Sequence, residues 1–342
     1  MKQIRTEEAV GHVICHDITR IIKDKEKGVA FKKGHVVTEE DIPVLLSIGK
    51  ENLYVWEKAE GMLHEDEAAQ ILAAACKNEH MSLSEAKEGK IEVFAERDGL
   101  FVVDIERLNA INSIDNMMIA TRHTMQYVKE GDKLAGTRII PLVIEAEKME
   151  EVSAIANEQS PILSIKPMVR KKAGVVTTGS EVYKGRIKDT FTPVIEEKLK
   201  NFGAKMVMHR TVSDEKEQII AAIQEMKQSG MELIVCTGGM SVDPDDLTPA
   251  AIRDSGADII TYGAPVLPGA MFLLGYFEDG TPVMGLPGCV MYAKATIFDM
   301  ILPRVLADVK VTKEDIVKLG NGGLCLNCPV CHYPNCGYGK GV

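Results

Sequence analysis

Between residues 171 and 307, short apolar runs alternate regularly with amphipathic stretches. Apolar runs that end at glycine or polar residues predict strands, and apolar positions three and four residues apart predict helices. Asp214 and Glu217, for example, form a capping-box pattern before a helical stripe that runs to Met226. Strands are predicted at 173–179, 204–210, 232–239 and 257–262, and helices at 192–202, 214–230, 248–256 and 290–307.

This alternation predicts an α/β fold for residues 171–307. Strand–helix–strand units cross over with a right hand, which gives a mostly parallel sheet sandwiched by helices. The dipeptide Asp279-Gly280 predicts a hairpin whose second arm leads into the last helix.

Residues 1–170 show a different pattern, with short strand-like runs and smaller β-containing units. Thr38 followed by Asp41 predicts a helix start, and alternating runs on both sides of Asp98-Gly99 predict a hairpin. We expect residues 1–60 to form a small α+β unit and residues 61–170 to form a linker helix and a β-containing middle domain. The basic run 170–172 is typical of a solvated linker.

The composition excludes several classes of protein. Of 342 residues, 45% are hydrophobic and 26% are charged, as in ordinary globular proteins and unlike disordered chains. The net charge of -10 repels phosphate backbones and anionic lipid, so neither nucleic acid nor a membrane is an expected partner. No apolar run approaches the roughly 18 residues of a spanning helix, and the first residues lack the apolar core of a signal peptide. We therefore expect a cytoplasmic protein.

Glycine-containing turns follow three of the predicted strands. Because the carboxyl ends of parallel strands meet at one edge of a sheet, we expect these turns to converge on one crevice. Glycines let backbone N–H groups approach an anion, and Thr and Ser add hydroxyl donors, so the natural ligand carries phosphate. The candidate binding residues are Thr177, Thr178, Gly179, Ser180, Thr237, Gly238, Gly239, Ser241, Pro287 and Gly288.

Carboxylates follow the same strand ends: Glu181, Asp189, Asp243, Asp245 and Asp246. Acidic groups beside an anion site suit a hard cation such as Mg²⁺, which bridges them to phosphate oxygens. Each could instead be a helix cap or a solvated side chain. The chain contains neither a P-loop nor a GxGxxG turn after a strand, which disfavours P-loop hydrolysis and Rossmann binding.

Four segments carry a resemblance to a known family: VVTTGSEV, GRIKDT, CTGGMSVDPDDLTPAAI and PVMGLPG. In order and spacing, over about residues 170–307, they resemble the molybdopterin-binding domain shared by molybdopterin molybdotransferases and molybdopterin adenylyltransferases. The resemblance implies that molybdopterin binds at the carboxyl edge of the sheet. It also implies either Mg²⁺-dependent molybdate insertion from adenylated molybdopterin or the preceding adenylation.

The segment PVLPGAMFLLG resembles the molybdotransferase branch, whereas DDLTPAAI resembles the adenylyltransferase version of its motif. By this resemblance Asp246, Asp189 and Glu181 are catalytic, Asp246 and Asp189 hold Mg²⁺ or molybdate, Asp245 lies in the substrate site, and the protein is a homodimer. Leu267 and Ala270 stand where that branch usually has lysines. The expected function is molybdotransferase-like; the alternatives are a non-catalytic molybdopterin carrier or sensor and an adenylyltransferase-like enzyme.

A cysteine-rich tail occupies residues 320–342. Its thiols, Cys325, Cys328, Cys331 and Cys336, have spacing that suits Zn²⁺ or an iron–sulfur cluster, although a tail without stable metal is an equal alternative. The tail has few apolar residues, so we expect its order to come from metal or a partner. The remaining histidines have no spacing that marks a ligand pair.

Overall fold

The structure, a computed structural model, describes residues 2–22, 26–55, 61–157 and 161–341. Its internal contacts divide the chain into two compact units. The first comprises residues 1–97, 103–122 and 129–165, and the second comprises 98–102, 123–128 and 166–342. The four-segment division made from the sequence stays a prediction.

Residues 2–55 form the first part of the first unit. A helix follows Thr38 as predicted, but Thr38 does not cap it. Helix α1 begins at Asp41 after Glu40, and the backbone N–H and the hydroxyl of Thr38 both donate to Asp41 Oδ2 at 2.8 Å. The buried core here includes Ile14, Leu45 and Leu53. The elements are β1 (Lys2–Arg5), η1 (Thr6–Glu8), β2 (Ile18–Ile22), β3 (Glu26–Phe31), α1 (Asp41–Ser47) and β4 (Asn52–Val55), with β1 antiparallel to β4 and β2 to β3.

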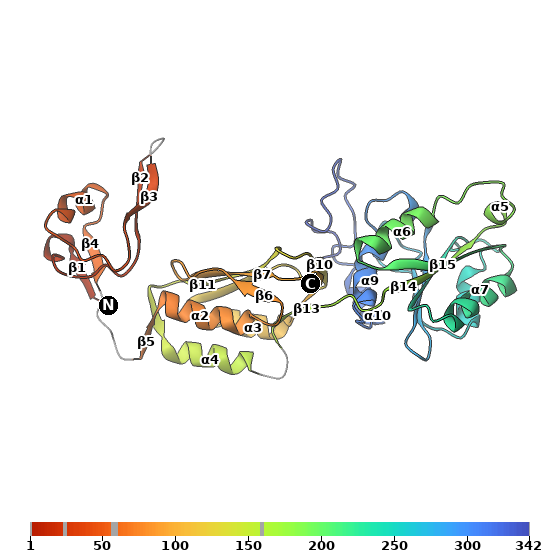
Figure 1. The fold of residues 1–342 in the computed structure, drawn as a ribbon, viewed down its shortest axis with the longest axis horizontal. Helices are drawn as coiled ribbons and strands as arrows, with labels where there is room; N and C mark the ends of the chain where they lie inside the picture. Colours follow the sequence, from red (N-terminus) through yellow and green to blue (C-terminus); the bar gives the residue numbers. More distant parts are fainter. Residues whose placement is uncertain (1, 23–25, 56–60, 158–160, 342) are drawn as a thin grey trace. The chain divides into compact units, whose positions relative to one another are not determined.

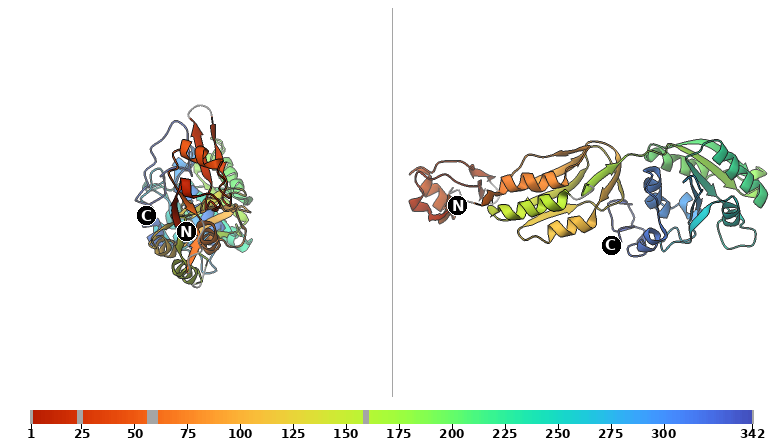
Figure 2. Two further views of the ribbon diagram at one scale, coloured as in Figure 1. Left: turned by 90° about the vertical axis from the view of Figure 1, so that its left-hand side faces the viewer. Right: turned by 90° about the horizontal axis from the view of Figure 1, so that it is seen from below.

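The rest of the first unit is a four-stranded antiparallel sheet, β6-β7-β11-β9, with helices packed on it. Helices α2 and α4 lie side by side, and α2 contacts β7 and β11 (Figures 1 and 2). The elements are β5 (Met62–His64), α2 (Glu65–Cys76), β6 (Met81–Leu83), β7 (Lys90–Ala95), α3 (Ile105–Asn112), β9 (Met117–Thr121), β11 (Lys133–Ile139), β12 (Val143–Glu145), α4 (Ala146–Ala156) and β13 (Leu163–Lys166).

The hairpin predicted around Asp98-Gly99 is wrong. Strand β7 pairs with β6 and β11, whereas β8 (Gly99–Val103) pairs antiparallel with β10 (Gln126–Val128). Asp98 accepts a hydrogen bond from the Tyr127 hydroxyl at 3.1 Å, so it faces β10 rather than closing a turn onto β7. Strands β7 and β8 are therefore neighbours in sequence but pair with different strands, and the spacing of apolar residues does not predict this pairing.

The second unit contains the six-stranded sheet β15-β14-β16-β19-β18-β17. Strands β14, β15, β16 and β19 are parallel, and β18 is antiparallel to both β17 and β19. The predicted mostly parallel α/β sheet is thus confirmed. The strands are β14 (Lys172–Thr178), β15 (Lys205–Val212), β16 (Leu233–Thr237), β17 (Asp258–Tyr262), β18 (Leu273–Tyr276) and β19 (Pro282–Leu286).

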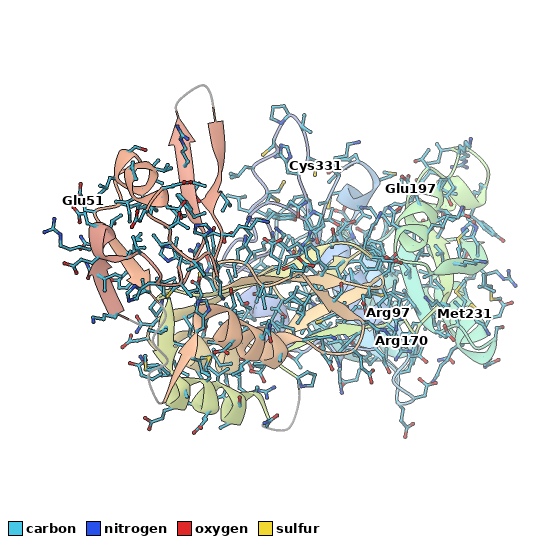
Figure 3. The ribbon with its side chains drawn as sticks, turned by 60° about the vertical axis from the view of Figure 1, so that its left-hand side comes forward. Glu51, Arg97, Arg170, Glu197, Met231 and Cys331 are labelled. Carbon is cyan, nitrogen blue, oxygen red and sulfur yellow. The ribbon has the colours of Figure 1, made fainter. Side chains whose placement is uncertain are left out.

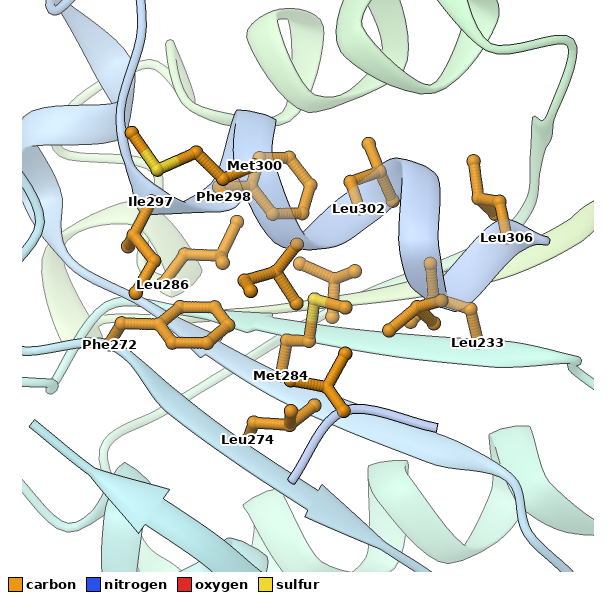
Figure 4. Packing of buried hydrophobic residues seen from close by; sticks show 14 of the residues in the cluster. Leu233, Phe272, Leu274, Met284, Leu286, Ile297, Phe298, Met300, Leu302 and Leu306 are labelled. Atoms are coloured by element: carbon orange, nitrogen blue, oxygen red, sulfur yellow. The ribbon is translucent and has the colours of Figure 1, made fainter. Parts of the chain in front are cut away.

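Helices cover both faces of this sheet. On one face, strand residues such as Phe272 and Leu286 pack against Phe298 and its neighbours in α9 (Figure 4). On the other face, Ile223 of α7 and Ile252 of α8 pack against a second cluster. The helices are α5 (Ser180–Tyr183), α6 (Thr192–Asn201), α7 (Lys216–Gln228), α8 (Thr248–Asp254), α9 (Ile297–Leu306) and α10 (Lys313–Lys318), with a 3₁₀ turn η2 (Gly288–Met291).

The single helix predicted over 290–307 is wrong. The chain forms η2, leaves the helical conformation, and begins α9 only at Ile297. The cause is a capping box inside the run: the Thr296 hydroxyl accepts the Phe298 N–H at 3.2 Å, and Asp299 accepts the Thr296 N–H at 2.7 Å.

The contacts of Arg170 show that the basic run 170–172 is not simply a solvated linker. The Arg170 guanidinium donates to the carbonyl oxygens of Glu232 and Gly280 at 3.1 and 3.2 Å, and it pairs with Asp308 at 2.6 Å (Figure 3). Arg170 therefore ties the start of β14 to the segments that come just before β16 and β19, at the same end of the sheet. Among the helices in the described ranges, none is both long and apolar enough to cross a membrane.

The expectation that the tail has too few apolar residues to pack by burial is also wrong. Tyr338 is 6% exposed and packs in the core of the second unit, and its hydroxyl donates to the Pro268 carbonyl at 3.1 Å. Tyr333 donates to the Asp299 carbonyl at 3.2 Å. Leu267 donates to Gly323 O at 2.7 Å and accepts from Cys325 N at 2.8 Å. Two tyrosines and a short backbone pairing thus supply the burial that the composition seemed to lack.

Tyr338→Ala is expected to lower the free energy of unfolding by about 3–5 kcal/mol, because it empties a buried aromatic site. The measurement is denaturant unfolding of the full chain. Val330→Ala is the matched control: Val330 is 66% exposed in the same tail, and its loss should change stability by less than about 0.5 kcal/mol. Equal small effects of the two changes would contradict the packing of the tail.

Candidate functional site

Three strand ends meet at one edge of the sheet in the second unit. Thr177 at the end of β14 is in register with Thr237 of β16, which is in register with Leu286 of β19. The turns that follow these parallel strands therefore start side by side. This geometry brings together the candidate residues from three separate parts of the sequence.

The turn after β16 requires glycine at two positions. Gly238 and Gly239 have φ values of +86° and +55°. A Cβ on Gly238 would lie 2.3 Å from the Thr178 carbonyl oxygen, and one on Gly239 would lie 2.8 Å from the Thr248 hydroxyl. The hydroxyls of Thr178 and Thr248 are themselves 3.2 Å apart. The turn thus lies directly against the end of β14 and the start of α8, with no room for a side chain at either glycine.

Asp246 lies beside this turn. Its Oδ2 accepts the Ser241 N–H at 2.8 Å, and its Oδ1 lies 3.7 Å from the position of a Cβ on Gly239. Tyr262 closes the loop from β17, because its hydroxyl donates to the carbonyl oxygens of Met240 and Ser241 at 3.1 and 3.2 Å. Burial raises the pKa of Tyr262, and the negative charge of Asp246 adds to the rise. Asp246 is thus half-buried with one oxygen committed to the loop.

Asp189 has a different environment. Its Oδ1 accepts the backbone N–H groups of Phe191 and Thr192 at 2.9 and 3.0 Å, and its Oδ2 accepts the Thr192 hydroxyl at 2.5 Å. Burial opposes its ionisation, but these hydrogen bonds outweigh burial and lower the pKa of Asp189. His209 Nε2 lies 3.7 Å from Asp189 Oδ2 and 3.0 Å from the Thr177 hydroxyl. Both oxygens of Asp189 therefore anchor the start of α6 to β14 and β15.

The anchor at Asp189 predicts a pH dependence. A lowered folded-state pKa gives stability that is present above the unfolded pKa of about 3.9 and is lost as pH falls through the folded value. Asp189→Asn should therefore reduce stability at pH 7 and flatten the loss of stability below about pH 4. Denaturant midpoints measured across pH 2–7 check this. A parallel shift at every pH would contradict it.

The remaining candidates lie in the first turn and on the exposed loop. Glu181 is exposed on α5, and no side-chain hydrogen bond to it is seen in the described ranges. Ser180 donates its N–H to Asp214 Oδ2 at 2.8 Å, so Asp214 braces the first turn instead of capping α7 as predicted; α7 begins after Glu215. Gly179 has a φ of +138°. Asp243, Asp245 and Gly288 are exposed, and Pro287 is buried.

One buried polar atom at this edge has no partner. Thr237 is fully buried at the end of β16, and its hydroxyl makes no hydrogen bond within the described part of the chain. An unpaired buried hydroxyl costs free energy. The predicted site residues Thr178, Gly238, Gly239 and Asp246 lie close together at this edge. Thr248, His209 and Tyr262 also lie here but were not predicted as site residues, because they come from other elements that only the folded sheet brings near.

The tail thiols do not form a ready metal centre. Within the ranges that the structure covers, the one group of three metal-ligating side chains whose ligand atoms all lie within 4.8 Å of one another is His64, Glu65 and Asp66 in the first unit. Cys328 and Cys331 are exposed, and Cys331 lies on a loop of the tail (Figure 3), whereas Cys325 and Cys336 are half-buried against the core.

Two segments of the chain match known domain families. Residues 174–307 match the family described as "Probable molybdopterin binding domain", and residues 3–57 match a domain family of unknown function. The chain is 25% identical over 181 residues to a molybdopterin molybdenumtransferase of Synechococcus elongatus, covering 50% of this chain and 42% of that protein. It is 32% identical over 93 residues to a CinA-like protein of Mycobacterium tuberculosis, covering 27% and 22% of the two chains. The matches thus span less than half of these relatives.

Solved structures also match. The molybdopterin biosynthesis enzyme MoaB from Thermus thermophilus is 21% identical, with a TM-score of 0.33, over 41% of this chain and 96% of that one. The tungsten cofactor synthesizing protein MoaB from Pyrococcus furiosus is 21% identical, with a TM-score of 0.31, over 41% and 89%. The segment 174–307, which contains the sheet edge described above, is therefore the part of the chain that matches the molybdopterin-binding domain family.

Proposed function

We propose that this protein acts in molybdenum cofactor biosynthesis and binds molybdopterin, or its adenylated form, where β14, β16 and β19 end. The observation that carries the proposal is the turn at Gly238 and Gly239, which lies against Thr178 and beside Asp246. Backbone at glycine turns can approach a phosphate closely. The unpaired hydroxyl of Thr237 in the same strand end supports a polar ligand there.

We propose further that the reaction is molybdotransferase-like. Mg²⁺ would neutralise phosphate charge, and molybdate is the substrate to be inserted. Asp246 is the residue best suited to hold Mg²⁺, because one of its oxygens accepts the Ser241 N–H and no hydrogen bond to the other is seen in the described residues. Asp245 is exposed on the same loop. Asp189 is instead a positioning residue, since donors from α6 and β14 already engage its oxygens.

Two alternatives use the same site. A non-catalytic carrier or sensor is favoured by Leu267, which is 55% exposed and pairs through its backbone with the tail, at a position where the resemblance predicts a lysine. Without such cations an anionic substrate is held less tightly. An adenylyltransferase-like enzyme is favoured by the segment that starts α8, DDLTPAAI.

Two parallel incubations separate the three, the second containing molybdopterin, ATP and Mg²⁺. Purified full-length protein is incubated with adenylated molybdopterin, molybdate and Mg²⁺, and AMP release and molybdenum incorporation are followed together. Both signals are expected for the molybdotransferase. Binding without AMP release indicates a carrier, and formation of adenylated molybdopterin from molybdopterin and ATP indicates the adenylyltransferase. No binding of either pterin would contradict all three.

Two further properties belong to this proposal. We propose a homodimer, which light scattering across micromolar concentrations tests; a monomer mass throughout would contradict it. We also propose that Zn²⁺ or an iron–sulfur cluster binds the tail thiols, which requires exposed Cys328 and Cys331 to close onto Cys325 and Cys336. Metal analysis of anaerobically purified protein tests this, and absence of both zinc and iron would contradict it.

A further inference from the structure

A second group of ligand-type side chains lies in the first unit, where α2 begins. One ligand atom each from His64, Glu65 and Asp66 lies within 4.8 Å of the other two. His64 is 3% exposed and Glu65 is 6% exposed. This group takes no part in the proposed molybdopterin site.

A cation already sits among these groups. The Lys33 ammonium lies 3.0 Å from His64 Nδ1 and 2.7 Å from Asp66 Oδ2. Those two atoms are 3.8 Å apart, so one ammonium group bridges them. The Lys33 side chain is 39% exposed and long, which allows it to leave without disturbing the fold.

Lys33 contacts His64 and Asp66 but makes no hydrogen bond to Glu65, the third member of the group. Hydrogen bonds engage Asp66, through Lys33 and the Gly89 N–H, and Glu67, through the His64 N–H. No hydrogen bond to the Glu65 carboxylate is seen within the described residues, although the side chain is more than nine-tenths buried. The positive end of a helix attracts acidic residues, but it does not require one of them to be buried without a partner.

The tautomer of His64 suits metal binding. The carbonyl oxygen of Cys15 can only accept, so His64 Nε2, which lies 3.0 Å from it, carries the proton. Nδ1 is then the acceptor: it accepts the backbone N–H of Asp66 at 3.2 Å as the cap of α2, and it lies 3.0 Å from the Lys33 ammonium. A backbone carbonyl that fixes the ring in this way is a common support for a metal-binding imidazole.

We propose that His64, Glu65 and Asp66 bind a divalent transition-metal ion, which displaces the ammonium of Lys33 and takes the Nδ1 lone pair of His64 from the Asp66 N–H. One imidazole nitrogen and two carboxylates are ligands that Mn²⁺, Fe²⁺ and Zn²⁺ all accept. A doubly charged ion at this position would ligate Glu65 as well as Asp66, whereas the ammonium acts on Glu65 only through its charge.

The test uses Mn²⁺ as the probe, because it prefers oxygen and nitrogen ligands over the tail thiols. The full-length protein carries Asp246→Asn, so that the proposed Mg²⁺ site does not contribute. Free Mn²⁺ is measured by electron paramagnetic resonance during titration. We expect one Mn²⁺ per chain, at least tenfold weaker binding with Glu65→Gln, and at least tenfold tighter binding with Lys33→Met, which removes the competing cation.

Glu85→Gln is the matched control, because Glu85 is exposed on the loop after β6 and should leave affinity unchanged. Thermal unfolding gives a second readout: Mn²⁺ should raise the Tm of the parent and of Lys33→Met but not of Glu65→Gln. Affinity that is unaffected by both Glu65→Gln and Lys33→Met, or no Mn²⁺ binding to folded Lys33→Met, would overturn the proposal. Neither result bears on molybdopterin binding, which is measured separately.

Discussion

Gly238→Ala is expected to lower the free energy of unfolding by at least about 3 kcal/mol and to abolish molybdopterin binding. The added Cβ would lie 2.3 Å from the Thr178 carbonyl oxygen, and alanine is strained at a φ of +86°. The atom in the way of the new Cβ is a backbone carbonyl of β14, so the clash cannot be relieved by a change of side-chain rotamer. Either β14 and β16 separate at the site edge or the turn changes shape.

Gly230→Ala is the control for this change. Gly230 also has a positive φ, +73°, but nothing lies within 4 Å of its Cβ position. It should cost only about 1 kcal/mol for the left-handed conformation and leave ligand binding intact. Denaturant unfolding and ligand titration of both variants check the prediction. Equal costs would show that the close approach of Gly238 to Thr178 is not maintained in solution.

Asp246→Asn is expected to reduce Mg²⁺-dependent turnover at least 100-fold while pterin affinity changes less than tenfold. A neutral amide replaces a carboxylate poorly on a hard cation, yet its oxygen can still accept the Ser241 N–H that shapes the loop. Asp258→Asn, at the exposed start of β17 and outside this loop, serves as the control and should keep turnover within a few-fold.

The assay follows AMP release at several Mg²⁺ concentrations. Turnover of Asp246→Asn that recovers at high Mg²⁺ supports a metal-holding role, because the defect then lies in Mg²⁺ affinity. Unchanged turnover at all concentrations contradicts any role of Asp246 with Mg²⁺.

The sequence predicted the sheet of the second unit well because each of its parts is local. An apolar run, a glycine turn and a helix follow one another within about 30 residues, as in 172–203. Thr178, Gly238 and Asp246 could be grouped for the same reason: Thr178 ends β14, Gly238 directly follows β16, and Asp246 lies in the loop between β16 and α8. Their detailed roles depend on contacts with Thr248 and Tyr262, which spacing does not reveal.

The predictions for the last helix, the hairpin at Asp98-Gly99 and the tail were wrong for two kinds of physical reason. Thr296 and Asp299 restart a helix within one continuous apolar run, so a local cap overrode periodicity. The strand partners of β8 and the burial of Tyr338 were set by long-range packing. The group at Glu65 was missed because its cation, Lys33, is 32 residues away in sequence and His64 has no second histidine at ligand spacing.

Direct binding of molybdopterin tests the central claim most simply. Adenylated molybdopterin is titrated anaerobically into the full-length protein and into Gly239→Val, whose side chain would collide with the Thr248 hydroxyl at the proposed site. We predict saturable binding of one ligand per chain, weakened at least tenfold in a Gly239→Val protein that circular dichroism shows to be folded. Equal affinity of the two proteins, or no binding by the unmodified chain, would contradict the assignment of this sheet edge as the molybdopterin site.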